Sequence, residues 1–473
     1  MATDKKTSAE DAAGTLDGSE IIRVSKETSP GNYESRRTTT QEVADLATPT
    51  VINQTINVTG GNELYLHTFG DGVNTPGTDT GATLQSLGYN SGDFATQFPN
   101  MDANYPDSID LSTMTYDLAC AQEAMYTLAN GSNRKRYLNG GDGVYRLAGG
   151  TLYIPGFKGT GTSGEEERFI FNGQGVKFRK TGSQAIMISS DVPNQTDAAS
   201  KNIFHTWEFG SFNCIGNDTG TAIRMGGHKG NNIHDINIEK FARGFHAGFM
   251  LNTAYHQVNV NMCEEGFYID KGWWTGAGYA NAGNQPRFYN CRARMVSNTA
   301  RGWVVLCADT PTWDGCTVEG VEAEYGIFID NMDASTSKKA TIRDLHVELG
   351  DASPGVPGEW AKAIIGYKGK DAHHILISQV YNQNGAGDQV LLEMDSTIGV
   401  CTAVLFVNRH GEGSDNWQFR NVNSGGRGCW VFDETMIDGK PATYNKLVNG
   451  SSFFTADSVL PENDDVRYTQ LLF

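Results

Sequence analysis

Basic charge, long apolar runs and a secretion signal are all missing from this 473-residue sequence. Its 37 basic residues are outnumbered by 55 acidic residues, and no basic stripe is present that would replace the counterions of a nucleic acid. No run approaches eighteen apolar residues, and the opening "MATDKKTSAEDAAG" is too polar for a signal peptide. We therefore expect a soluble protein that binds no nucleic acid and inserts into no membrane.

Paired cysteines and the common catalytic motifs are also absent. The 8 cysteines include no CxxC pair, so we expect neither a metal site nor a disulfide framework, and most of the cysteines are predicted to be small buried residues. No P-loop, HExxH or GxSxG motif signals phosphoryl transfer, zinc proteolysis or ester hydrolysis. We predict no cofactor.

What the sequence does have is glycine, at 56 residues spread along the chain, which favours frequent turns. Short stretches alternate apolar and polar residues and recur about once every 23 residues. In most units a second strand follows a glycine. These glycines are 24, 22, 36 and 24 residues apart: Gly220, Gly244, Gly266, Gly302 and Gly326.

Two sets of positions define the alternation in the first strand of each unit. The apolar positions, predicted to point inward, are Phe212, Cys214, Ile236, Ile238, Val258, Val260, Cys291, Ala293, Cys316, Val318, Leu345 and Val347. The polar positions, predicted to point outward, are Asn213, Asn237, Asn259, Arg292, Thr317 and His346. Repeated strands without a helical face predict an all-β protein of stacked coils, a right-handed single-stranded parallel β-helix. A β-sandwich is the alternative.

Residues 111–157 contain a helical pattern, "STMTYDLACAQEAMYTLANG", followed by the strand pattern "VYRLAGGTLYIPGF". Leu118, Ala121, Met125 and Leu128 share one face of that helix, and Gly131 is placed to end it. This order resembles the start of the pectate-lyase-like β-helix in phage tailspikes and capsule depolymerases, where a short helix caps the open end. The resemblance covers roughly residues 110–435.

The N-terminal "LDGSEIIRVSKETSPGNYESRRTTTQEVADLA" is predicted to form a strand, a turn at Ser29–Asn32, a second strand and a short helix. It resembles the small module that opens many phage tail and fibre proteins. The predicted organisation is a virion-attachment module (1–50), a linker or neck (51–110), the β-helix with its capping helix (111–435) and a closing segment (436–473).

Together these resemblances imply a homotrimeric tailspike or tail fibre protein, assembled in the host cytoplasm and carried on the phage virion. It would dock on other tail proteins through residues 1–50 and bind a host surface polysaccharide, with or without cleaving it. Two alternatives stay open: a non-enzymatic structural part of the virion, such as a fibre adaptor or collar decoration, and a free polysaccharide hydrolase or lyase.

The stretches "GFYID" and "GIFID" carry the candidate catalytic acids. Asp270 and Asp330 are predicted to point outward from coils two rungs apart, about 9.6 Å at ~4.8 Å per rung, at the edge of what an inverting glycosidase allows. Glu264 and Glu324 form a second pair with the same relation. The runs "WIDH" and "RxPxxR" of pectate lyases are absent, so a glycoside hydrolase is favoured over a lyase.

A subunit interface is the competing interpretation of the same wall. An outward apolar stripe usually meets another subunit, and the stripe here consists of Tyr268, Val304, Leu306 and Phe328. Two longer units carry insertions at 271–286 and 350–362, and such insertions lie on the surface of a coil stack. Their aromatic residues could stack on sugar rings or could close gaps in the coil wall: Trp273, Trp274, Tyr279 and Trp360.

Overall fold

The protein is described by a computed structural model, in two compact units. The residues that the structure describes are 21–29, 32–39, 63–130, 135–154, 168–190, 206–226, 230–248, 252–270, 283–295, 297–306, 308–320, 323–331, 339–349, 360–369, 373–382, 390–396, 401–410, 418–421, 429–433, 436–437, 440–441, 447–448 and 453–455.

The first unit contains an antiparallel hairpin of β1 (Ile21–Ser29) and β2 (Asn32–Thr39). Ile21 lies opposite Thr39, and the register shifts once near the turn. Both strands confirm the sequence prediction for this segment. The short helix predicted after them lies outside the described residues.

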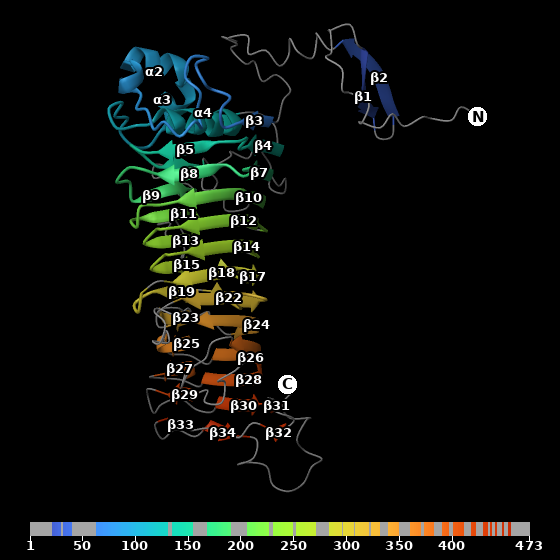
Figure 1. The fold of residues 1–473 in the computed structure, drawn as a ribbon, viewed down its shortest axis with the longest axis vertical. Helices are drawn as coiled ribbons and strands as arrows, with labels where there is room; N and C mark the ends of the chain where they lie inside the picture. Colours follow the sequence, from blue (N-terminus) through green and yellow to red (C-terminus); the bar gives the residue numbers. More distant parts are fainter. Residues whose placement is uncertain are drawn as a thin grey trace, which may run out of the picture. The chain divides into compact units, whose positions relative to one another are not determined.

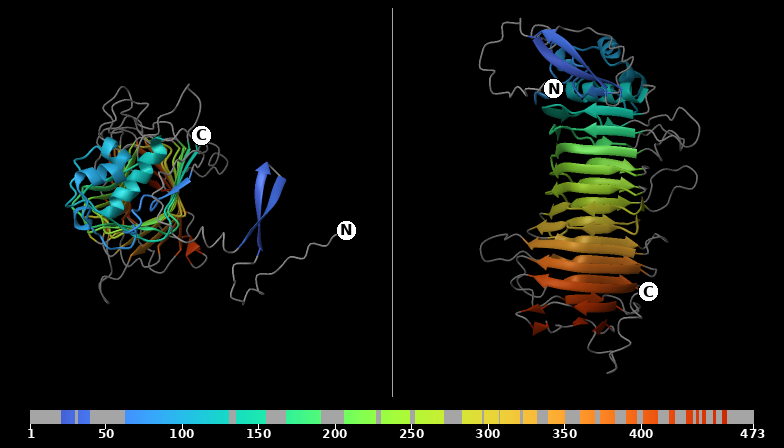
Figure 2. Two further views of the ribbon diagram at one scale, coloured as in Figure 1. Left: turned by 90° about the horizontal axis from the view of Figure 1, so that it is seen from above. Right: turned by 90° about the vertical axis from the view of Figure 1, so that its right-hand side faces the viewer.

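The second unit is a stack of coils built from β-strands (Figures 1 and 2). Strands of successive coils pair in parallel and form three long sheets, so the predicted parallel β-helix is confirmed. The first sheet runs in the order β3 (Glu63–Tyr65), β4 (Lys135–Asn139), β7 (Arg168–Asn172), β10 (Thr206–Ile215), β12 (Asn232–Glu239), β14 (Ala254–Asn261), β17 (Arg287–Tyr289), β21 (Thr312–Asp314), β24 (Lys339–Leu349), β26 (His373–Asn382), β28 (Cys401–His410), β30 (Cys429–Asp433) and β34 (Phe453–Thr455).

The second sheet uses the later halves of the long strands β10, β12, β14 and β24 together with β5 (Val144–Leu147), β8 (Lys177–Lys180), β18 (Arg292–Met295) and β22 (Thr317–Gly320). The third sheet runs in the order β6 (Leu152–Tyr153), β9 (Ile186–Ser189), β11 (Thr221–Gly226), β13 (Arg243–Gly248), β15 (Glu265–Asp270), β19 (Arg301–Val305), β23 (Ala323–Asn331), β25 (Trp360–Gly369), β27 (Val390–Ser396), β29 (Gln418–Asn421) and β33 (Leu447–Val448). Two small ladders complete the pairing: β16 (Gly283–Asn284) with β20 (Ala308–Asp309), and β31 (Met436–Ile437) with β32 (Lys440–Pro441).

The predicted inward positions form the core of the coils. All twelve of them are at most 1% exposed, and pairing places them in columns, one residue per rung. Cys291 and Cys316 occupy equivalent buried positions on adjacent rungs, as predicted. Burial raises the pKa of the Cys291 thiol, which keeps it protonated and unreactive at neutral pH.

The chain turns the corner between the first and second sheets at a single residue whose backbone adopts the left-handed conformation. The φ angles at this position lie between +49° and +63° in successive coils. These corner residues are Ser211, Asp235, Gln257, Asn290, Gly315 and Asp344. The same conformation thus recurs at the corner of six successive coils.

The repeated glycines of the third sheet were expected to be turn residues, but most of them do not adopt the positive φ that a turn glycine provides. Only Gly220 has a positive φ among the five. At Gly302 an added Cβ would lie 2.4 Å from the carbonyl oxygen of Gly326, and at Gly266 it would lie 2.5 Å from that of Gly302. These glycines are therefore required by the close approach of backbone on neighbouring rungs.

Helices close the N-terminal end of the stack, where α4 (Tyr116–Asn130) lies across the first coils (Figures 1 and 2). The predicted capping helix is confirmed, but it is buried on nearly all sides rather than on one face. It is covered by η2 (Gln85–Leu87), α2 (Ser91–Gln97) and α3 (Pro99–Asn104), with Phe94, Phe98 and Met101 in the core. None of the helices in the described part of the chain has the length and hydropathy to span a bilayer.

Both ends of the stack differ from the sequence prediction. Residues 63–104 were expected to be part of a linker or neck, but β3 begins the first sheet and the helices that follow belong to the cap, because their apolar residues have a core to join. At the other end, β33 and β34 add strands to the third and first sheets, so the coils continue past residue 435.

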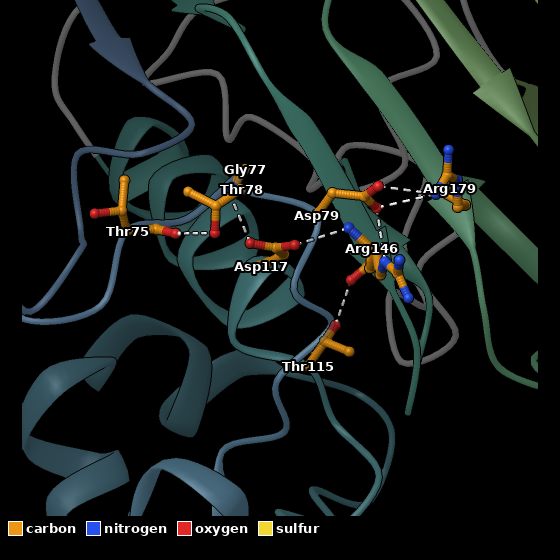
Figure 3. Close-up of polar contacts among 8 residues, drawn as sticks. All are labelled: Thr75, Gly77, Thr78, Asp79, Thr115, Asp117, Arg146 and Arg179. Atoms are coloured by element: carbon orange, nitrogen blue, oxygen red, sulfur yellow. Dashed lines mark hydrogen bonds and ion pairs between the residues drawn. The ribbon is translucent and has the colours of Figure 1, made fainter.

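A network of polar contacts joins this cap to the first coils (Figure 3). Asp79 accepts hydrogen bonds from Arg146 (2.6 Å) and Arg179 (3.0 Å), which lie on adjacent rungs. Asp117 of α4 accepts the backbone N–H groups of Gly77 and Arg146, each at 2.8 Å. The cap loop, the capping helix and two coils are thus held together by two carboxylates.

Candidate functional site

The four predicted acids lie on or beside the third sheet. Asp270 ends β15 and Asp330 lies near the end of β23, with β19 paired between them. Phe267 and Ile269 are buried, as the alternation predicted, so the residues between and after them face outward. The predicted relation of the two aspartates, two rungs apart on one wall, is confirmed by the strand register.

Asp270 has a histidine of the preceding coil as its neighbour. The Nε2 atom of His246 lies 3.8 Å from a carboxylate oxygen of Asp270, and the His246 and Tyr268 rings meet edge to face at 5.0 Å. Burial lowers the pKa of His246 below its usual value, so its imidazole is neutral at pH 7. The neutral imidazole lies beside the Asp270 carboxylate without neutralising its charge.

An arginine and a glutamate complete this cluster. The Arg243 guanidinium lies 3.6 Å from the centre of the Tyr268 ring and donates a hydrogen bond of 2.7 Å to Glu265. His246, Arg243 and Glu265 were not among the predicted site residues. A signal was available, because His246 and Tyr268 are 22 residues apart, as are Arg243 and Glu265, which is the length of one coil.

Glu264 and Glu324 differ in their surroundings although they occupy equivalent places. Glu264 is exposed, whereas the Glu324 side chain is only 12% exposed and lies between Arg301 (2.6 Å) and Lys362. Burial alone would raise the pKa of Glu324, but hydrogen bonds from Lys362 and Arg301 outweigh it and lower the pKa. A lowered pKa disfavours the protonated form that a general acid needs.

The predicted apolar stripe is largely covered within a single chain. Val304 is 1% exposed and Phe328 is 9% exposed, while Tyr268 and Leu306 are half-buried. Phe328 stacks on Tyr325 at 4.7 Å. The stripe was expected to be an exposed surface, but its two central residues are buried because neighbouring side chains of the same wall cover them.

Of the four aromatic residues predicted to contact sugar, the structure describes only Trp360. Trp273, Trp274 and Tyr279 lie outside the described residues. Trp360 begins β25 and pairs with Ala323 of β23. Their role in glycan binding stays a prediction.

A polar groove that the sequence reasoning missed lies along the corner between the first and second sheets. It has a volume of about 330 Å³ and is lined by Asp235, Asn237, Gln257, Asn259 and Asn290. These residues come from β12, from β14 and from the corner between β17 and β18, which are successive coils. The outward polar positions of the repeat were the available signal for it.

Side-chain amides form a hydrogen-bonded ladder beside this groove. Asn237 donates to the Asn213 side-chain oxygen at 3.0 Å, and Asn259 donates to that of Asn237 at 3.0 Å. On the first-sheet side of the corner, the rings of His256 and Tyr289 stack at 4.8 Å. The corner is thus lined by a column of asparagine amides on one side and by the stacked rings of His256 and Tyr289 on the other.

Comparison with known proteins found no matching family model and no matching curated protein. Among solved structures, a similarity was found to tailspike protein 3 of bacteriophage CBA120, with 12% sequence identity and a TM-score of 0.39. The similarity covers 93% of this chain and 64% of that chain. At this identity and TM-score the likeness carries no argument, and the parallel β-helix rests on the strand pairing itself.

Proposed function

We propose that this chain is a phage tail protein, of the tailspike or tail fibre class, that binds a host surface polysaccharide along its coil stack. The observation that carries the proposal is the repetition of outward polar and aromatic side chains once per coil, as in the ladder of Asn213, Asn237 and Asn259. Such columns match a polymer whose own units repeat. The hairpin at the N-terminus agrees with the attachment module that the sequence resembles.

Cleavage of the bound polysaccharide is assigned to Asp270, which lies beside His246, with Asp330 two rungs away as the second carboxylate that hydrolysis needs. Purified protein is incubated with host capsule or lipopolysaccharide, and chain length is measured by size-exclusion chromatography. Shortened chains with the native protein and unchanged chains with Asp270→Asn support hydrolysis. Binding without shortening leaves a receptor-binding protein, and no binding at all refutes the proposal.

A purely structural part of the virion is the second candidate. The ion pairs of Glu324 favour this candidate: its carboxylate is paired with Arg301 and Lys362 and is not available as a general acid. A structural part would bind no polysaccharide in the same assay.

Three parallel chains around one axis are proposed for the assembled protein, on the ground of its resemblance to phage tailspikes. The half-buried Tyr268 and Leu306 are the members of the apolar stripe left to contact a second chain. Light scattering should report about three times the chain mass of 51.4 kDa. A stable monomer would rule the trimer out.

A further inference from the structure

We infer that the corner groove binds an uncharged, hydroxyl-rich stretch of the glycan that lies along the stack axis; this rests on the proposed function. Four of the five lining side chains are amides and the fifth is a carboxylate; none of the five is apolar or basic. An apolar ligand would find no surface to bury there, and an anionic ligand would find no counter-charge. Hydroxyl groups, which both donate and accept, match this lining.

The amide ladder keeps bonding capacity for a ligand. Each side-chain amide has two N–H donors and an oxygen with two lone pairs. In the ladder, Asn237 uses one N–H toward Asn213 and its oxygen accepts one bond from Asn259. A second donor and a second lone pair therefore remain on the Asn237 amide, and a pair of neighbouring hydroxyls on a sugar can engage both.

The positions of the lining residues on successive coils indicate in which direction a bound glycan chain would run. The lining residues belong to three successive rungs, and rungs are ~4.8 Å apart, close to the length of one pyranose unit. A chain that runs along the stack would meet one corner residue per sugar, in the order Asp235, Gln257, Asn290. The exposed ring of His256, stacked on Tyr289, stands at the same corner for the C–H face of a sugar.

The charges around the groove disfavour uronic and sialic acids. The Asp235 side chain is 51% exposed at the groove, and its carboxylate is already in contact with His234, whose Nδ1 lies 2.8 Å away. Arg292, which follows Asn259 in the outward column, is bound to Glu319 at 2.7 Å. A carboxylated sugar in the groove would therefore face the Asp235 carboxylate, and none of the five lining side chains is basic. The net charge of the chain, −18, disfavours an acidic ligand further.

The test uses the full-length protein and a panel of immobilised bacterial surface polysaccharides, half of them neutral and half bearing uronic or sialic acids. We expect the native protein to bind neutral members. Asn237→Ala and Asn259→Ala should each weaken that binding about fivefold to tenfold, as loss of one or two neutral hydrogen bonds implies. Asp235→Asn should retain it and increase binding to acidic members.

Thr317→Ala is the matched control, because Thr317 faces outward in the same column two rungs beyond Asn259 and is not part of the groove. Hydrogen exchange of residues 232–261, with and without a bound polysaccharide, locates the ligand if a variant fails to fold. Unchanged exchange there, or asparagine variants that bind like the native protein, would refute the groove and leave the proposed function standing. A preference of the native protein for acidic members would refute the charge inference. Binding to no member would refute both.

A divalent cation is the other species that carboxylate and amide oxygens can hold. Calorimetric titration with calcium alone separates the two ligands. Calcium binding that is lost in Asp235→Asn, together with polysaccharide binding that is unaffected by it and by the asparagine variants, would assign the groove to an ion and overturn the inference.

Discussion

At the scale of single residues, the glycines of the third sheet mark where backbone approaches backbone. Gly302→Ala would place its new methyl group 2.4 Å from the Gly326 carbonyl oxygen, and neither strand can move without disturbing the next rung. We expect a loss of about 1–3 kcal/mol in the free energy of unfolding, the usual range for overpacking. Urea unfolding followed by circular dichroism measures it.

Gly92→Ala is the control for this substitution. Gly92 lies in α2, where alanine is favoured, and its added Cβ would meet only the side chain of Asn90, at 3.2 Å. Its unfolding midpoint should stay within error of the native value or rise. Equal losses for the two variants would contradict the close-approach explanation.

His246 should make stability depend on pH. Its pKa in the folded protein is lowered by burial, so below the ordinary value near 6.5 the unfolded chain binds a proton that the folded chain does not. This residue's contribution to stability is complete above pH 6.5 and falls as the pH drops toward the folded pKa. His246→Gln, which cannot titrate, should lose less stability than the native protein between pH 7.5 and pH 5.5, measured as urea midpoints. The same loss in both proteins would contradict a lowered pKa of His246 in the folded state.

At the scale of elements, the cap depends on a carboxylate buried between α4 and the first coils. Asp117→Ala leaves the N–H groups of Gly77 and Arg146 without their acceptor in a site where the native side chain is only 5% exposed. One unsatisfied buried donor costs about 1–3 kcal/mol, so the variant should unfold at clearly lower urea concentration. Asp110→Ala is the control, since Asp110 is exposed and its carboxylate accepts hydrogen bonds from Ser112 of its own turn. A stable Asp117→Ala protein would mean that the cap does not need this contact.

The coils were predictable from sequence because two short-range signals coincide in them. Alternation with period two sets which side chains face inward, and burial of Phe212 and Cys214 or of Ile236 and Ile238 follows it directly. The spacing of one coil then brings like positions together. Neither signal depends on the length of a distant loop.

The cap was missed because its helices are too short to show a period. α2 has seven residues and α3 has six, so the apolar Phe94, Phe98 and Met101 do not complete two turns of one helix. Their surroundings are rich in glycine, asparagine and aspartate, which is also typical of a linker. A cap and a linker of this composition differ only in whether the segment covers the open end of a coil stack.

The site was partly hidden for a related reason. Contacts across one plain coil, such as Arg243 with Glu265, are 22 residues apart and can be found from the period. The contact of Lys362 with Glu324 spans 38 residues, since an insertion interrupts the period. The corner groove depends on a left-handed residue in each coil, and Gln257 carries no sequence signal for that conformation.

At the scale of the whole molecule, the boundary of the coil body is testable by truncation. A chain that starts at residue 58 keeps β3 and the covering helices, and it should unfold with the same midpoint as the full chain. A chain that starts at Tyr105 loses Leu64, Phe94 and Met101, which are at most 4% exposed, and uncovers α4. The structure predicts that it aggregates, which size-exclusion chromatography detects, and a monodisperse shorter chain would show that the cap is dispensable.

The alternation within each strand also determines where the protein tolerates changes of length. One residue added between Val258 and Val260 would turn Val260 from the inside of its coil to the outside, because alternation within a strand leaves no position that absorbs an extra residue. The number of residues between a strand of the third sheet and the next strand of the first sheet varies instead, from five between β13 and β14 to sixteen between β15 and β17. Evolutionary divergence of such a chain, and grafting of foreign peptides onto it, can therefore proceed along that one edge while the phase of every coil is preserved.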